Sequence, residues 1–286
     1  MTEKITLATL KRYKRENRPI TMLTCYDYAT AMLLEQAGVD GILVGDSLAQ
    51  VVLGHKNTLP ATMDLMIALT AAVRRGAPNV YLVGDMPFLS YQVSPERAVL
   101  NAGRFLTEAG CDAVKFEVDH RHRDLIERLS TAGIPVMAHL GYRPQWASQS
   151  SRVVETRSVQ RACQLVQNGL DIINAGACSI LLECVTTVAA RALAERTDLP
   201  VISCGSGSYC DGQVLVLHDI LSLPGAAQPR FSRTYADIGR QISSAAAQYV
   251  EDIKEKRFPD DEHSYHMKPE HQQQFQQWLE NRDKNS

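Results

Sequence analysis

The alternation of short apolar runs with longer segments of helical period is the feature that most constrains the fold. The runs are rich in Val, Ile and Leu, and the segments between them carry apolar residues three and four positions apart. This alternation is typical of βα units, in which helices cover a buried parallel sheet. The pattern predicts strands at 20–25, 41–45, 80–84, 113–117, 135–139, 179–183, 200–204 and 213–219.

Helices are predicted between and after these strands. Ser94, Pro95 and Glu96 mark one helix start clearly, with a capping hydroxyl, a proline at the first helical position and an acid in the first turn. The chain has no internal repeat and no low-complexity linker, so we expect a single domain over 1–286, with 234–286 as a C-terminal helical extension. The predicted helices lie near 27–38, 63–75, 95–109, 121–132, 156–175, 186–196, 234–256 and 268–281.

Eight strands with intervening helices fit either a closed barrel or an open doubly wound sheet. No GxGxxG motif follows the first strand, and polar residues at the carboxyl ends of many strands converge only if the sheet closes on itself. The least certain element is the strand at 213–219, because the Pro- and Gly-containing stretch 221–234 follows it in place of a helix. We therefore predict an α/β fold of the (β/α)8 TIM barrel type.

Composition favours a small ligand over a macromolecular one. The chain has 30 Lys and Arg against 32 Asp and Glu, and no basic face with interleaved aromatic residues, so nucleic acid is not an expected partner. The N-terminal segment lacks the apolar core of a signal peptide, and no run of about 18 apolar residues occurs. The 7 cysteines are scattered without a CxxC pair. These features predict a cytoplasmic protein with reduced cysteines and no membrane partner.

Polar residues stand at the carboxyl ends of five predicted strands. One such residue is ordinary turn chemistry, but five give a barrel mouth too polar for a purely structural core. Their side chains can bind a cation, hold an anion or move a proton. The residues are Asp46 with Ser47, Asp85, Lys115 with Glu117, His139 and Glu183.

The alternation of strand side chains predicts which of these residues face the barrel interior. Lys115 and Glu117 lie two positions apart and face the same side, whereas Phe116 faces the other. The same count pairs Val44 with Asp46 and predicts that the apolar member of each pair fills the barrel floor. The polar member would then lie one level higher, at the rim.

Two aspartates at neighbouring strand ends suggest a metal site. Asp46 and Asp85 would repel each other unless a cation lay between them, and carboxylate oxygens suit Mg²⁺, which keeps positions open for water and substrate. An alternative is that each aspartate caps the loop or helix that follows it. Lys115 could also replace the metal in part, or simply pair with Glu117.

The residue types at the strand ends indicate metal-assisted proton abstraction next to a carbonyl. A divalent ion chelated by a 2-oxo acid would acidify the neighbouring C–H bond enough for a carboxylate base. Glu183 ends an apolar strand and would have the raised basicity that such a base needs. Lys115, with help from His139, would balance the charge on the enolate oxygen.

The order of several motifs also resembles the ketopantoate (3-methyl-2-oxobutanoate) hydroxymethyltransferase family. The resemblance spans nearly the whole chain, and the motifs are specific when they are taken together. They are "MLTCYDYATA", "GILVGDSLAQVVLGHKNTLPAT", "TAAVRRGAP", "DMPFLSY", "VKFE", "AHLGYRPQ", "LLECV", "DGQVLVLHD" and "PDDEHSYH".

The resemblance implies a (β/α)8 barrel that uses Mg²⁺ and takes a one-carbon unit from 5,10-methylenetetrahydrofolate. The acceptor would be 3-methyl-2-oxobutanoate and the product 2-dehydropantoate, on the route to pantothenate. Members are typically large homo-oligomers, often decamers, so association is expected. The implied roles are metal binding for Asp46 and Asp85 with Glu117 close by, oxo-acid binding for Ser47, Asp85, Lys115 and His139, and base catalysis for Glu183.

The chain departs from the family pattern in three places. The loop 146–158 contains no glycine, the strand-seven motif reads "SCGSGSYCDG", and Leu69 replaces a histidine. Because the metal and base residues are all retained, we expect enolate chemistry with altered surroundings. A paralogue with another 2-oxo acid or another one-carbon donor therefore stays open.

Three further alternatives remain open at this stage. The phosphoenolpyruvate mutase and isocitrate lyase group also places acids and Mg²⁺ at a barrel mouth, but its Lys-Lys-Cys-Gly-His type motif is absent. The stretch "CGSGS" is a possible phosphate cradle. The chain could also be a non-catalytic assembly subunit, and its "FPDDEHSYH" segment could serve an interface or be a solvated tail.

Overall fold

The computed structural model describes residues 3–149, 154, 156–224 and 228–284. Contacts divide the chain into two units, Met1–Ala236 and Asp237–Ser286, and each is described here by itself. The first unit contains all the strands and the predicted site. The second unit contains two helices, α10 (Ile238–Lys254) and α11 (Pro269–Asp283).

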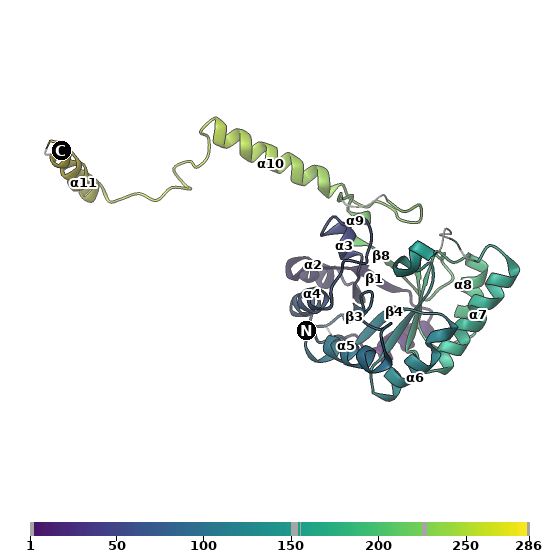
Figure 1. Ribbon diagram of the computed structural model, residues 1–286. Helices are drawn as coiled ribbons and strands as arrows, with labels where there is room; N and C mark the ends of the chain where they lie inside the picture. The colour runs from purple at the N-terminus through teal and green to yellow at the C-terminus, as the bar shows by residue number, and fades with distance from the viewer. Residues whose placement is uncertain (1–2, 150–153, 155, 225–227, 285–286) are drawn as a thin grey trace. The chain divides into compact units, whose positions relative to one another are not determined.

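Eight parallel strands close into a barrel in chain order, with β1 paired to both β2 and β8 (Figure 1). The closed sheet with alternating helices confirms the predicted (β/α)8 barrel and excludes the open doubly wound sheet. The strands are β1 Ile20–Thr24, β2 Gly41–Val44, β3 Tyr81–Asp85, β4 Ala113–Glu117, β5 Val136–Gly141, β6 Ser179–Glu183, β7 Val201–Cys204 and β8 Gly212–Leu215.

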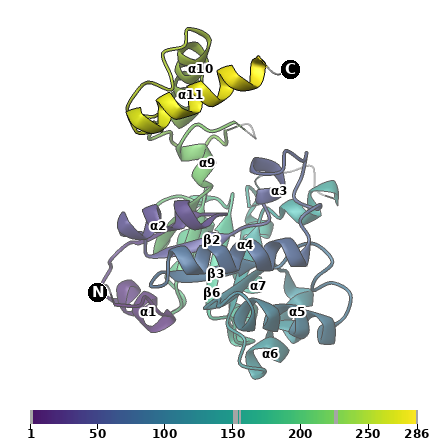
Figure 2. The same ribbon diagram turned by 90° about the vertical axis from the view of Figure 1, so that its left-hand side faces the viewer.

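Helices surround the barrel, as the two ribbon views show (Figures 1 and 2). Ser94 caps its helix as predicted, because its side chain accepts a hydrogen bond from the Arg97 amide. The helices of the first unit are α1 Leu7–Arg15, α2 Tyr28–Gln36, α3 Leu48–Val51, α4 Met63–Gly76, α5 Pro95–Thr107, α6 Arg123–Thr131, α7 Val159–Asn174, α8 Thr187–Ala194 and α9 Leu217–Ile220, with 3-10 turns at His120–His122 and Pro144–Gln149.

Helix α1 was not among the predicted elements. It is short and basic, and only Leu10 and Tyr13 are buried in it. These two side chains pack with residues of the barrel interior, and Lys14 donates hydrogen bonds to the Ala194 and Leu199 carbonyl oxygens. Contacts far along the chain therefore stabilise α1, and a local sequence pattern does not reveal them.

The strand side chains divide between two cores. Phe116 and Val44 belong to the core between strands and helices, whereas Leu43, Met137 and Leu181 belong to the core inside the barrel. The predicted inward orientation of Val44 is therefore wrong. Strand β2 ends at Val44, so the period of two no longer applies to the turn that carries Asp46.

The last predicted strand is shorter than expected. The sequence pattern places a strand at 213–219, but β8 ends at Leu215 and α9 begins at Leu217. The Leu217 amide donates a hydrogen bond to the Thr24 hydroxyl, which holds the start of α9 against the end of β1. His218 and Asp219 therefore lie on a short helix at the carboxyl end of the barrel (Figure 2).

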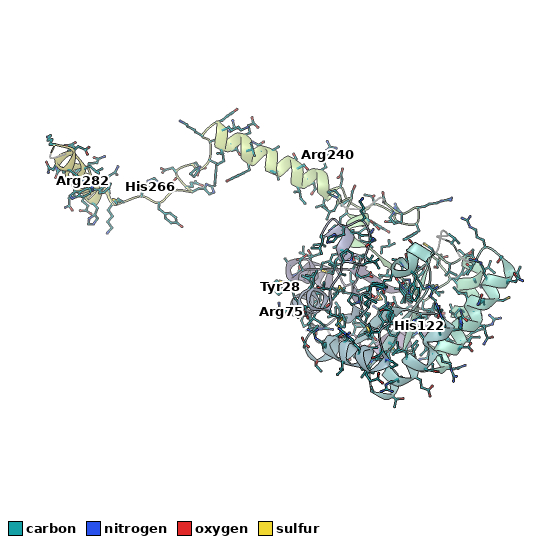
Figure 3. All side chains as sticks on the ribbon, in the orientation of Figure 1. Tyr28, Arg75, His122, Arg240, His266 and Arg282 are labelled. Atoms are coloured by element: carbon teal, nitrogen blue, oxygen red, sulfur yellow. The ribbon has the colours of Figure 1, made fainter. Side chains whose placement is uncertain are left out.

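The second unit has two helices, and neither contains a buried residue. Figure 3 labels Arg240 on α10, His266 in the connection and Arg282 on α11. The Asp237 side chain caps α10 by accepting a hydrogen bond from the Arg240 amide. In the part of the chain that the structure describes, no helix is both long and apolar enough to cross a membrane.

Candidate active site

A cavity of about 490 Å³ opens at the carboxyl ends of the strands. Every site residue predicted from the sequence lines this cavity, although the residues come from five different strands or the turns after them. The barrel thus brings together positions that are up to 137 residues apart in the sequence, Asp46 to Glu183. The predicted residues in the cavity wall are Asp46, Ser47, Asp85, Lys115, Glu117, His139 and Glu183.

Asp46 and Ser47 are held in a tight turn after β2. A Cβ atom on Gly45 would lie 2.8 Å from the Ser47 Oγ, so a side chain there would displace the Ser47 hydroxyl. The Asp46 amide donates a hydrogen bond to the Asp85 Oδ2 at 3.0 Å, and the Ser47 hydroxyl contacts the Tyr26 hydroxyl at 2.9 Å. Neighbouring strand ends are therefore linked directly, and these contacts differ from the alternative in which each aspartate caps the loop or helix that follows it.

Lys115 is the cation of the cavity floor. Its Nζ lies 2.9 Å from the Asp85 Oδ1 and 3.4 Å from the His139 Nδ1. The ammonium therefore pairs with Asp85 and not with Glu117, the pairing that the sequence had left open. Burial disfavours the charged ammonium, but the nearby carboxylates outweigh burial and raise the pKa of Lys115 above its usual value.

His139 is neutral in this setting. Burial and the adjacent Lys115 ammonium hold the pKa of His139 well below its usual value. Its Nε2 lies 3.3 Å from the Glu183 Oε2, and its other ring nitrogen faces Lys115. The imidazole therefore lies between Glu183 and Lys115 without adding a charge.

Gln145 is a site residue that sequence reasoning missed. Its backbone amide donates to the Glu117 Oε1 at 2.9 Å, and its Nε2 donates to the Asp46 Oδ2 at 2.9 Å. Its Oε1 accepts a hydrogen bond from the Tyr91 hydroxyl at 2.8 Å. The residue ends the quoted motif "AHLGYRPQ", but its position in a turn after β5 gave no periodic signal. Gln145 thus holds two carboxylates of the site, one through its backbone amide and one through its side-chain amide.

The carboxylates share more negative charge than Lys115 can neutralise. Burial raises the pKa of Glu117 to about 9 and, despite the opposing effect of Lys115, raises the pKa of Asp85 to about 7. The Glu117 Oε2 is buried and has no hydrogen-bond partner among the described residues. A bound cation would relieve both the repulsion and the missing contact.

Mg²⁺ fits this donor set as an open site. Within the described residues, no three His, Cys, Asp or Glu side chains are arranged to hold a metal ion by themselves. Mg²⁺, however, is usually bound through one or two carboxylates and keeps several waters. Asp46, Asp85 and the free oxygen of Glu117 supply hard ligands of that kind. The residues therefore suit a partly hydrated ion that a substrate can chelate.

Glu183 lies apart from these acids, at the end of β6. Its backbone is fixed because its carbonyl oxygen accepts a hydrogen bond from the Tyr142 amide, and Cys184 after it has a left-handed φ of 51°. Burial raises the pKa of Glu183 to about 7, although Lys115 opposes the shift. A carboxylate with this pKa accepts a proton more readily than an ordinary glutamate.

The strand-seven loop is engaged in internal contacts. The Ser206 amide donates to the Ser203 hydroxyl, and the Ser206 hydroxyl donates to the Leu182 carbonyl oxygen. A Cβ atom on Gly205, whose φ is +72°, would lie 2.5 Å from the Phe231 ring. These contacts do not favour the phosphate cradle considered from the sequence. In the glycine-free loop 146–158, residues 150–153 and 155 lie outside the described residues.

Sequence comparison assigns nearly the whole first unit and the start of the second to one family. The family model for ketopantoate hydroxymethyltransferase matches residues 4–261. A 3-methyl-2-oxobutanoate hydroxymethyltransferase from Carboxydothermus hydrogenoformans is 43% identical over 269 residues, covering 94% of this chain and 98% of the relative. One from Chloroflexus aggregans is 45% identical over 264 residues, covering 92% and 94%.

Solved structures with low sequence identity share the fold. A phosphonopyruvate hydrolase in complex with oxalate and Mg²⁺ has a TM-score of 0.59 at 13% identity and covers 96% of this chain and 97% of its own. A 2,3-dimethylmalate lyase of the PEP mutase/isocitrate lyase superfamily has a TM-score of 0.58 at 16% identity, covering 98% and 96%. With the barrel, the cavity and the close relatives all in agreement, the chain belongs to the ketopantoate hydroxymethyltransferase family.

Proposed function

We propose that the protein transfers a hydroxymethyl group from 5,10-methylenetetrahydrofolate to 3-methyl-2-oxobutanoate. One water is consumed, and the products are 2-dehydropantoate and tetrahydrofolate. The names of the relatives support this reaction. One observation carries the proposal. The same cavity is lined by Glu183, a carboxylate with a raised pKa, and by a cluster of acids around Lys115.

The oxo acid would bind at the β2–β5 side of the cavity. Asp46, Asp85 and Glu117 would hold Mg²⁺, which when bound withdraws electron density from a chelated 2-oxo acid and so acidifies its C3–H bond. Ser47 and Lys115 would donate hydrogen bonds to the carboxylate and keto oxygens. The apolar wall, which includes Leu43, Leu181 and Val214, would receive the branched alkyl group.

Glu183 would take the C3 proton. Its carboxylate would become a neutral acid, the electron pair of the C–H bond would form the C2=C3 double bond, and the π pair of the carbonyl would move onto the keto oxygen as an enolate. Lys115 would stabilise that oxygen through its ammonium, and neutral His139 would lie between Glu183 and Lys115. The water would release the one-carbon unit as formaldehyde, which breaks both of its C–N bonds and leaves tetrahydrofolate. The enolate carbon would then attack the formaldehyde carbon, a C–C bond would form, and the new alkoxide would take the proton held by Glu183.

The expected assembly and location are parts of the same proposal. Family membership leads us to infer a homo-oligomer, a decamer, working in the cytoplasm. Light scattering of the purified protein would measure the subunit number, and a monomer would contradict this inference. The partners would be a small 2-oxo acid and a folate, without nucleic acid or membrane.

A substrate panel tests the proposed reaction. Several 2-oxo acids would be incubated with Mg²⁺ and methylenetetrahydrofolate, and product formation would be followed by NMR. We expect hydroxymethylation of 3-methyl-2-oxobutanoate in preference to straight-chain acids. A preference for another acid would identify a paralogue, and the absence of any reaction together with no binding of 2-oxo acids would favour a non-catalytic assembly subunit.

A further inference from the structure

The rim of the cavity near β8, β1 and β2 carries groups that the proton abstraction does not use. Asp219 on α9 lines this rim, as do Thr58 from the loop between α3 and α4 and Phe231 after α9. Figure 2 shows α3 and α9 at the same end of the barrel strands. The oxo-acid residues and Glu183 come from β2 to β6, so this rim is free to serve a second ligand.

Asp219 is a half-buried carboxylate without a compensating partner. In the described part of the chain, no hydrogen bond or ion pair reaches its side chain. Burial alone raises the pKa of Asp219, and no nearby cation opposes that shift. A carboxylate in this setting favours a ligand that offers hydrogen-bond donors.

Thr58 gives an independent indication of a ligand at the same rim. The residue is 4% exposed, and its hydroxyl is buried without a hydrogen-bond partner among the described residues. The neighbouring polar side chain is already used, because the Asn57 Oδ1 accepts a hydrogen bond from the Leu59 amide. A buried hydroxyl in a cavity wall is costly to leave unpaired, so a ligand atom is its natural partner.

Phe231 adds a flat apolar surface beside these polar groups. Its ring packs over Gly205 and remains 37% exposed. Aromatic side chains at such positions stack against planar heterocycles. A carboxylate, a hydroxyl and an aromatic face in the wall of one cavity are the groups that suit a planar ring with hydrogen-bond donors along one edge.

We propose that Asp219 binds the 2-amino-4-oxopyrimidine edge of the pterin ring of the one-carbon donor, with the ring against Phe231 and a hydrogen bond from Thr58. This edge presents an N3–H and a 2-amino group side by side, which match the two oxygens of one carboxylate. The inference rests on the proposed folate-dependent function. A cavity of about 490 Å³ cannot enclose a whole folate together with the oxo acid, so only the pterin end enters.

The decisive experiment compares two soluble ring systems that differ at the recognised edge. Tetrahydropterin carries the 2-amino group, whereas tetrahydrolumazine has an oxygen in its place. We expect the full-length wild-type protein to bind tetrahydropterin at least about tenfold more tightly, measured by calorimetry in the presence of Mg²⁺ and 3-methyl-2-oxobutanoate. In Asp219→Asn the ratio of the two dissociation constants should fall close to one.

Control variants separate recognition from folding. Asp198→Asn makes the same chemical change at an exposed position at the opposite end of the barrel and should keep the wild-type ratio. Asp219→Glu keeps a carboxylate and should retain part of the preference, whereas Thr58→Val should weaken binding of both rings about equally. An unchanged ratio in Asp219→Asn, or a wild-type protein without preference, would overturn the inference.

The same proteins distinguish failure of the inference from failure of the proposed function. Product formation from methylenetetrahydrofolate by the wild-type protein tests the function alone. Product with an unchanged ratio in Asp219→Asn would remove the inference and keep the function. A ratio that depends on Asp219, without product, would keep the pterin site and remove the proposed reaction.

Discussion

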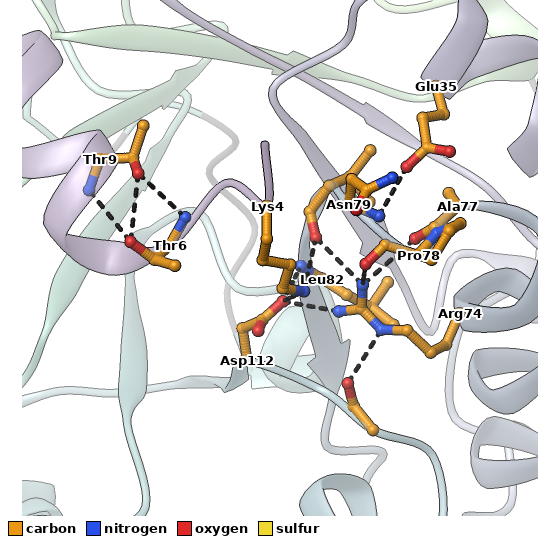
Figure 4. A network of polar contacts seen from close by, with 12 residues as sticks. Lys4, Thr6, Thr9, Glu35, Arg74, Ala77, Pro78, Asn79, Leu82 and Asp112 are labelled. Carbon is orange, nitrogen blue, oxygen red and sulfur yellow. Dashed lines mark hydrogen bonds and ion pairs between the residues drawn. The ribbon is translucent and has the colours of Figure 1, made fainter. Parts of the chain in front are cut away.

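The two ends of the barrel use the same residue types in opposite ways. At the amino-terminal end, Asp112 Oδ2 accepts hydrogen bonds from Arg74, Lys4 and the Leu82 amide at 2.6, 2.9 and 2.8 Å (Figure 4). Asp211 is similarly paired with Lys14 and with the Val201 amide. At the carboxyl end, Asp46, Asp85, Glu117 and Glu183 line one cavity, in which Lys115 forms an ion pair with Asp85.

This difference separates stability from function. The paired acids at the amino-terminal end connect α1, α4 and the strand starts, and they have their hydrogen-bond partners in the free protein. At the mouth, burial raises the pKa values of Asp85, Glu117 and Glu183. Such sites destabilise the free fold and gain their partners when ligands bind.

The largest effect is expected at the proposed base. Glu183→Gln should lower turnover roughly 10³-fold or more, because the amide cannot accept the C3 proton. Binding of Mg²⁺ and the oxo acid should change little, since Glu183 lies apart from the proposed metal ligands. Steady-state kinetics with calorimetry would measure both. Glu195→Gln, an exposed change just after α8, is the matched control, and wild-type turnover in Glu183→Gln would move the base elsewhere.

The next effect concerns the proposed metal ligands. Asp85→Ala should weaken Mg²⁺-dependent binding of 3-methyl-2-oxobutanoate by about 100-fold, because it removes a hard ligand and leaves Lys115 without its ion-pair partner. Asp85→Asn keeps the shape of the side chain and should show most of the same loss in calorimetric titrations. Intact affinity in both variants would exclude Asp85 from the metal site.

At the amino-terminal end of the barrel, the same kind of change should lower stability and leave turnover unchanged. Asp112→Asn should lower the free energy of unfolding by roughly 2 kcal/mol, because Arg74 and Lys4 lose their shared partner, while kcat stays near wild type. Urea denaturation and kinetics measure the two quantities. Glu108→Gln removes an exposed helical pair with Arg104 and should change stability little. A loss of kcat at constant stability in Asp112→Asn would contradict the assignment of this end of the barrel to stability.

The smallest effect is the pH dependence of the mouth. Burial raises the pKa of Glu183 to about 7 in the folded protein, whereas the unfolded chain has the usual pKa of 4.5. Between pH 4.5 and 7 the folded protein keeps the Glu183 proton, whereas the unfolded chain loses it. The free energy of unfolding therefore falls as pH rises from 4.5 through 7. Turnover should rise with pH and level off above about 7.

Melting temperatures measured at two pH values check this assignment. Glu183→Gln should stabilise the free protein at pH 8, by no more than about 3 kcal/mol, and have little effect at pH 4.5. The glutamine cannot ionise, so it avoids the buried charge that wild type carries at high pH. Equal effects at both values would show that Glu183 has an ordinary pKa.

The sequence predicted the parts of the molecule that depend on periodicity. Strand alternation placed Lys115 and Glu117 at the barrel mouth, and repetition along the chain brought Asp46, Asp85 and Glu183 to the same cavity. The reason is that both signals follow from the geometry of strands in a closed parallel sheet. The roles assigned to these residues stay predictions.

Features outside regular strands could not be predicted in this way. Val44 was assigned to the wrong face because β2 ends at Val44, and the alternation of side chains does not continue to Asp46. Helix α9 was missed because its apolar sequence resembles the end of a strand. The contacts of Gln145 depend on a turn that folds over the mouth, which only tertiary structure defines. These errors concern the turns, where backbone direction is set by distant contacts.

Deuterium uptake at C3 of 3-methyl-2-oxobutanoate tests the central claim most directly, namely that the acids of the mouth gather to remove this proton. The wild-type protein in deuterated water, without folate, should catalyse exchange that requires Mg²⁺ and stops when a chelator is added. Exchange that continues at the same rate after chelation, or no exchange by a protein that binds the oxo acid, would contradict the account.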